Sequence, residues 1–121
     1  MIDKIKEFRS VINFGMEQLI DYLDARNEDY RENAKIKDSH PIVYQENLAL
    51  LEEEKMYIQH TVDFVKSIDI NQFKSPEEFR DYLLEDIKTY YKKHSIPNVC
   101  YIIMSDKINK CWKFYEDFFC D

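Results

Sequence analysis

A single glycine, Gly15, occurs in this chain of 121 residues. The chain has three prolines, Pro41, Pro76 and Pro97. Strands joined by tight turns need glycine for backbone angles that other residues resist. Nucleotide-binding loops and nucleophile elbows need several glycines close together. The scarcity of glycine therefore favours helices and argues against these catalytic architectures.

Length and composition are typical of one folded domain spanning residues 1–121. Hydrophobic residues make up 45% of the chain and aromatic residues 15%, which is enough for a substantial core. Twenty-four acidic residues against 17 basic ones leave a net charge of -7. That charge repels a nucleic acid, so we expect no direct nucleic-acid contact and favour a cationic protein as partner.

Charged side chains interrupt the apolar ones in residues 1–8, so this segment lacks the uninterrupted apolar core of a secretion signal. No stretch approaches the roughly eighteen apolar residues of a membrane span. Cys100 and Cys111, if they share a helix, are separated by a rise of about 16 Å, whereas a disulfide needs Cα atoms within about 7 Å. We therefore expect a cytoplasmic protein with reduced thiols. The frequent Lys, Ile and Asn residues are typical of low-GC bacteria and their phages.

The apolar spacing predicts a first helix that begins near Ile2 and breaks between Asn33 and Ser39. Disorder is expected only in the polar stretch of residues 27–39. The predicted inward residues are Ile5, Phe8, Ile12, Met16, Leu19, Leu23 and Tyr30.

Pro41 marks the start of a second helix, because proline is tolerated in a first helical turn. One apolar stripe of this helix comprises Tyr44, Leu48, Leu51, Ile58, Val62 and Val65. A second stripe comprises Leu50, Tyr57, Phe64 and Ile68. Two stripes predict neighbouring helices on two sides.

Ser75 and Pro76 predict the start of a third helix, with Ser75 as the N-cap and Glu78 as the acid of a capping box. This helix should end near His94. Its expected inward residues are Phe79, Leu83, Ile87 and Tyr90.

The last helix follows Pro97, although the short β-branched run of residues 99–104 also fits a strand. One stripe holds Cys100, Met104, Ile108, Cys111, Tyr115 and Phe118, and further apolar residues widen it. Such a wide arc predicts either a central position in the bundle or a self-association face at Trp112 and Phe119, as in a homodimer. The fold class that follows is all-α, an antiparallel bundle of about four helices.

Known catalytic and metal-binding spacings are missing from the sequence. None of the three histidines follows a glutamate by three residues, so the Glu-x-x-His pairs of di-iron bundles are absent. Cys120 has no neighbouring base that would lower its pKa. The run Glu52, Glu53, Glu54 cannot converge on one ion, because consecutive helical residues point in different directions. We expect no cofactor, no metal and no enzymatic activity.

An acidic stripe follows the outer side of the first helix, with spacings that alternate four and three. Its eight members, six of them carboxylates, are Asp3, Glu7, Ser10, Phe14, Glu17, Asp21, Asp24 and Glu28. Like charges four residues apart each cost about 0.2–0.5 kcal/mol. Only Glu28 has an evident counter-ion along the helix, Arg31.

Phe14, an aromatic residue in the middle of the stripe, suggests an anchor for a partner with a basic surface. The residues of this predicted binding face are Glu7, Phe14, Glu17, Asp21, Asp24 and Glu28. The alternative is an ordinary solvated face, with Phe14 covered by a neighbouring helix.

Two functions fit these observations. The first is a small acidic inhibitor of a basic protein, such as an immunity protein, an antitoxin or a phage-encoded anti-defence protein. The second is a structural subunit of a larger helical or nucleoprotein assembly.

Overall fold

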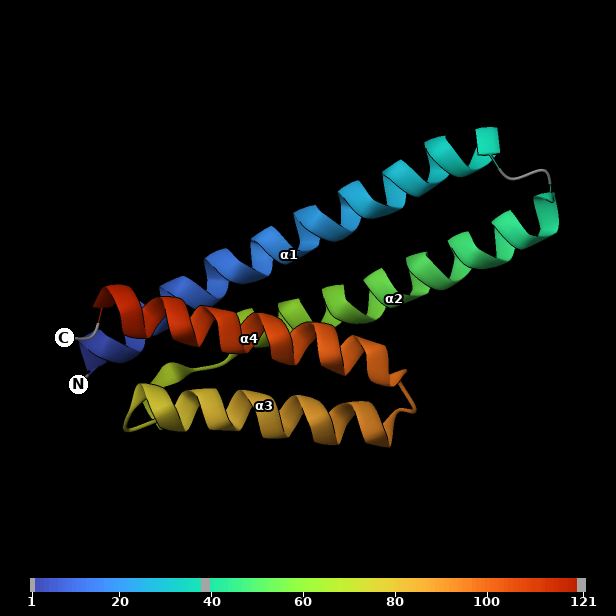
Figure 1. The fold of residues 1–121 in the computed structure, drawn as a ribbon. Helices are drawn as coiled ribbons and strands as arrows, with labels where there is room; N and C mark the ends of the chain where they lie inside the picture. Colours follow the sequence, from blue (N-terminus) through green and yellow to red (C-terminus); the bar gives the residue numbers. More distant parts are fainter. Residues whose placement is uncertain (1, 38–39, 120–121) are drawn as a thin grey trace.

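Helices make up nearly all of the chain in the computed structural model, which describes residues 2–37 and 40–119, with side chains for 4–33 and 40–119. The elements are α1 (Ile2–Lys37), α2 (Pro41–Ser67), the short 3-10 helix η1 (Ile70–Gln72), α3 (Pro76–Lys93) and α4 (Asn98–Phe119). Successive α-helices run in opposite directions (Figure 1). The predicted all-α antiparallel bundle of four helices is confirmed.

Two predicted helix starts are confirmed by their cap geometry. Pro41 lies in the first turn of α2, and the preceding residue, His40, has an extended backbone. Ser75 precedes Pro76 with an extended backbone, and its hydroxyl accepts a hydrogen bond from the Glu78 amide at 3.1 Å. Asp38 and Ser39, part of the predicted signal before Pro41, lie outside the described residues.

Two ambiguous segments are helical. Residues 99–104 belong to α4, so the strand alternative is wrong. The expectation of disorder in residues 27–39 is also wrong for residues 27–37, because α1 continues through Lys37. That last residue lies within the interval where the sequence predicts a break. The outer part of α1 is supported by α2, which runs back alongside it (Figure 1).

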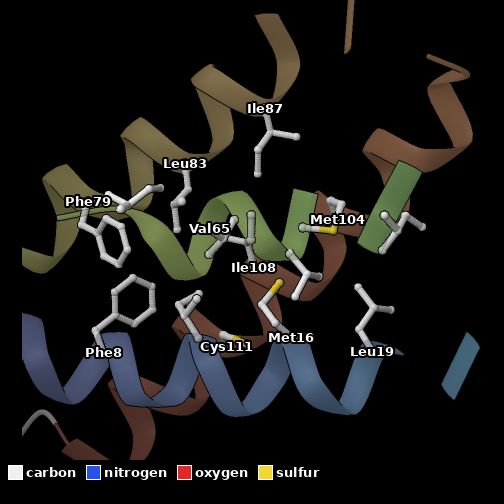
Figure 2. Close-up of a cluster of buried hydrophobic side chains, with 14 of the residues drawn as sticks. Phe8, Met16, Leu19, Val65, Phe79, Leu83, Ile87, Met104, Ile108 and Cys111 are labelled. Atoms are coloured by element: carbon white, nitrogen blue, oxygen red, sulfur yellow. The ribbon is translucent and has the colours of Figure 1, made fainter. Parts of the chain in front are cut away.

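Side chains from all four α-helices form one hydrophobic core. Figure 2 shows α3 and α4 directing Phe79, Leu83, Ile87 and Ile108 toward the row that α1 contributes. Ile58 of α2 is buried as well. The predicted inward residues of α1 are buried, with Tyr30 half-buried: Ile5, Phe8, Ile12, Met16, Leu19 and Leu23.

Several predicted core positions are wrong. Leu51 is half-buried, and Tyr90 is exposed whereas Tyr91 is buried. Spacings of three and four both continue the stripe from Ile87, so periodicity does not choose between the two tyrosines. Tyr91 turns inward, where its hydroxyl hydrogen-bonds the Thr61 hydroxyl. Further exposed members of the predicted apolar stripes are Leu50, Phe64 and Phe118.

The helices differ in length, which divides the molecule into two regions. The α1–α2 pair extends past the ends of α3 and α4 (Figure 1). We call residues 28–33 and 40–57 the arm and the remaining described part the body. No side chain of the arm is buried, because most of the arm lies beyond the ends of α3 and α4 (Figure 1).

Gly15 lies inside α1 rather than at a turn. A Cβ built at Gly15 would come within 2.4 Å of the Cys111 sulfur and 3.3 Å of Lys107 Cε. The lone glycine therefore allows a close approach of α1 and α4, whose seam includes the first candidate site.

The only residue with left-handed backbone among the described non-glycine residues is Ser95, at φ 53°. It follows α3, and the amide of Ile96 donates to the Tyr91 carbonyl at 2.9 Å while the Ser95 amide donates to Lys92 at 3.4 Å. This is the Schellman pattern, in which glycine is the usual residue. In this chain, Ser95 occupies the left-handed position.

Candidate functional site

The predicted binding face lies on the solvent side of α1. Its six residues, Glu7, Phe14, Glu17, Asp21, Asp24 and Glu28, are all exposed, as is Ser10. Asp3 lies outside the described side chains. Phe14 is 63% exposed, so the expectation that a neighbouring helix covers it is wrong.

Three carboxylates of the stripe have counter-ions. Glu28 pairs with Arg31 at 3.2 Å, as the spacing predicts. Glu17 pairs with Lys66 at 3.3 Å, and Asp24 pairs with Lys55. Both lysines belong to α2, so spacing along one helix, which indicates only Arg31, does not reveal them.

Glu7 and Asp21 are different. Neither makes an ion pair or a hydrogen bond in the described part of the chain. Exposed ion pairs contribute only about 0–1 kcal/mol each, so the paired carboxylates can exchange their counter-ions at little cost. Glu7 and Asp21 are the charges that a cationic partner could neutralise without first breaking an internal contact.

Beside Phe14, a groove of about 490 Å³ lies along the seam between α1 and α4. From α1 it is lined by Ser10, Val11, Phe14, Gly15 and Gln18, and from α4 by Lys107, Lys110, Cys111, Phe114 and Phe119. Phe114 lies 4.6 Å from Phe118 and 6.4 Å from Phe119, measured between ring centroids. An aromatic cluster at the end of α4 thus adjoins the aromatic residue of α1.

Trp112 and Phe119 have different surroundings. Trp112 is half-buried: its ring packs edge-on against Phe8 with centroids 5.1 Å apart, and the Arg80 guanidinium lies 4.4 Å above it. Phe119 is exposed and lines the groove. Of the two residues predicted for self-association, Phe119 is therefore the more accessible.

The carboxylate run of α2 supports structure at three separate places. Glu52 pairs with Arg31, Glu53 accepts a hydrogen bond from the Tyr57 hydroxyl at 2.9 Å, and Glu54 pairs with Arg26 at 2.7 Å. These different partners agree with the prediction that the three side chains diverge. No group of metal-binding side chains occurs among the described residues.

Both described cysteines are buried free thiols. Burial raises the pKa of Cys100 to about 11 and also raises the pKa of Cys111. Both are therefore protonated at neutral pH, whereas a nucleophilic cysteine needs the thiolate. Cys120 lies outside the described residues.

A second pocket, of about 260 Å³, lies between α2 and α3. Its lining residues are His60, Thr61, Phe64, Asp86, Ile87 and Tyr90. The sequence did not reveal this pocket, since nothing in the spacing of either helix indicates which residues meet across the seam. Asp86 was missed for the same reason.

No protein-family model matches the chain, and no curated protein or solved structure matches it. Among the described residues, no helix is both long and apolar enough to cross a membrane.

Proposed function

We propose that this chain is a cytoplasmic, acidic protein-binding module that neutralises a partner with a basic surface, as an immunity protein, an antitoxin or a phage-encoded anti-defence inhibitor does. The observation that carries the proposal is the exposed Phe14 on a carboxylate-rich helix face. An aromatic side chain that is solvated in the free protein gains apolar burial when a partner covers it.

The net charge and the groove beside Phe14 support the same proposed function. The net charge of -7 attracts a cationic protein over long range and speeds encounter. Glu7 and Asp21 supply local charges without internal counter-ions in the described part of the chain. The groove beside Phe14 offers apolar area into which a side chain of the partner fits.

Two variants test the binding face by quantitative pull-down at low salt, with lysate of the native host. Phe14→Ala and the double variant Glu7→Lys with Asp21→Lys should each lose most of one captured basic protein. Tyr22→Ala is the matched control for the first, because Tyr22 is also 63% exposed on α1. Glu46→Lys with Glu116→Lys, both exposed, is the control for the second.

Unchanged capture by both test variants, with helicity intact by circular dichroism, would contradict the proposal. Equal loss in the controls would also contradict it, because the effect would then follow total charge or exposed aromatic area rather than this face.

A structural role in a larger assembly is the second candidate, and the arm favours it. Leu50 is 65% exposed, and Ile42 and Val43 are exposed nearby on α2. Light scattering at rising protein concentration separates the two functions. A monomer supports the inhibitor, whereas a ladder of oligomers that Leu50→Ser abolishes supports the subunit. A dimer that Phe119→Ala dissociates supports self-association at the groove.

A further inference from the structure

The α2–α3 seam is the loosest in the body. α3 packs chiefly on α4 and α1, and the pocket of about 260 Å³ opens between α3 and α2. Ile87 at its floor belongs to the core (Figure 2). This volume is below the range of about 300–1,000 Å³ that drug-sized ligands occupy. It suits a single side chain.

Asp86 contributes a carboxylate to the lining of this pocket. It is half-buried, yet it forms no ion pair or hydrogen bond within the described part of the chain. His60 lines the same pocket, but no ion pair joins it to Asp86. A partly desolvated carboxylate is costly unless a donor compensates it. Burial and the charge of Asp86 raise the pKa of Tyr82 on the same helix. The pocket therefore presents a negative charge that no cation pairs with in the described part of the chain.

Two aromatic rings line the same pocket as this carboxylate. Phe64 and Tyr90 are both partly exposed in the pocket. Tyr90 is held by His94, with ring centroids 4.4 Å apart. The Thr61 hydroxyl is already engaged, because it donates to the Tyr57 carbonyl at 2.9 Å and contacts the Tyr91 hydroxyl. The pocket thus combines aromatic faces with a carboxylate that has no hydrogen-bond donor among the described residues.

We propose that this pocket receives an arginine side chain from the basic partner protein. A guanidinium stacks on aromatic faces and donates two parallel hydrogen bonds to a carboxylate, whereas an ammonium does neither as well. The proposal rests on the proposed function only in that a basic partner supplies the arginine. The pocket itself is separate from the α1 face, because it lies where α2 meets α3.

The test is a methyl NMR titration of the full chain with N-acetyl-arginine amide, observed at Ile87 and Thr61. Both methyl signals should shift and saturate. The neutral analogue N-acetyl-citrulline amide should bind at least about tenfold more weakly, because it lacks the charge. N-acetyl-lysine amide should also bind more weakly.

Asp86→Asn should weaken arginine binding by about tenfold or more. Glu85→Gln is the matched control, since Glu85 is an exposed neighbour on α3 and loses the same charge; it should leave the titration unchanged. Equal binding of citrulline or lysine amide, an unchanged Asp86→Asn titration, or shifts confined to other residues would overturn the proposal.

These outcomes are distinguishable from failure of the proposed function. The titration contains no partner protein, and Glu7→Lys with Asp21→Lys should leave it unchanged. If those variants keep full capture while arginine amide still shifts Ile87, the α1 face is wrong and the pocket stands.

Discussion

The same two long helices, α1 and α2, run through both the body and the arm, yet the two regions differ in how completely side chains are covered. In the body, Phe8 is fully buried, and its ring lies 5.8 Å from Phe79 and 5.3 Å from Tyr115. In the arm, Tyr30 stacks on Tyr44 at 5.7 Å, and both remain half-exposed. The difference teaches that apolar periodicity specifies a helix face, whereas the number of neighbouring helices decides its burial.

A polar layer marks the border between the two regions. Asn27 is buried and donates to the Leu51 carbonyl at 3.3 Å, while Arg26 donates to the Asn27 side chain at 3.1 Å. Arg26 also pairs with Glu54 at 2.7 Å. Beyond this layer, toward the far end of the arm, the described side chains make contacts only at the protein surface, and none of them is buried.

The other end of the long helices is held differently. The Arg9 guanidinium donates to the Ile68 carbonyl at 2.6 Å and also to the Lys66 carbonyl. One side chain of α1 thus satisfies two backbone acceptors at the end of α2, where helical carbonyls otherwise lack partners. This long-range contact secures α2 at the body, opposite the arm.

The largest expected effect compares one truncation in each region. Ile108→Ala, in the body, should lower the free energy of unfolding by about 2–5 kcal/mol through lost apolar burial and a cavity. Leu51→Ala, in the arm, should cost only about 1 kcal/mol, because Leu51 is already half-exposed. Urea denaturation followed by circular dichroism measures both. Similar costs for the two variants would refute the division into body and arm.

Gly15→Ala should destabilise the body by about 1–2 kcal/mol, since overpacking against Cys111 exceeds the helix-propensity gain. Adding Cys111→Ala should recover at least about half of this loss, because the new methyl group then fills the space left by the sulfur. A double-mutant cycle of unfolding free energies measures the coupling. A coupling near zero would mean that α1 and α4 are not in close contact there.

Asn27→Ala should reduce stability at the border by about 1 kcal/mol through the lost hydrogen bonds. Hydrogen exchange should show the loss as faster exchange of arm amides, with body amides unchanged. Equal acceleration throughout the chain would instead mean that arm and body unfold as one unit.

Ser95→Gly should stabilise the body by about 0.5–1 kcal/mol, because glycine adopts the left-handed conformation without the strain of a Cβ. The gain is the smallest of the four effects, and thermal unfolding with a matched Ser105→Gly control detects it. Ser105 lies inside α4, where glycine should destabilise. Destabilisation by both changes would contradict the role given to Ser95.

Local sequence signals predicted a large part of the fold. Pro41 and Ser75 mark helix starts because caps and first turns have local stereochemical requirements. The inward row from Ile5 to Leu23 follows from the helical repeat alone. The stripe that contains Phe14 was also recognisable, because a continuous face of one helix is a property of that helix.

Tertiary structure decided what depends on neighbours. It left Leu51 half-exposed, because α3 and α4 end before the outer part of α1 and α2, and it paired Glu17 with Lys66 across two helices. It also placed Asp86 in a pocket with His60, which is distant in sequence. The physical reason is that helix formation depends on contacts within a few residues, whereas burial, ion pairing and pockets depend on which helices lie side by side.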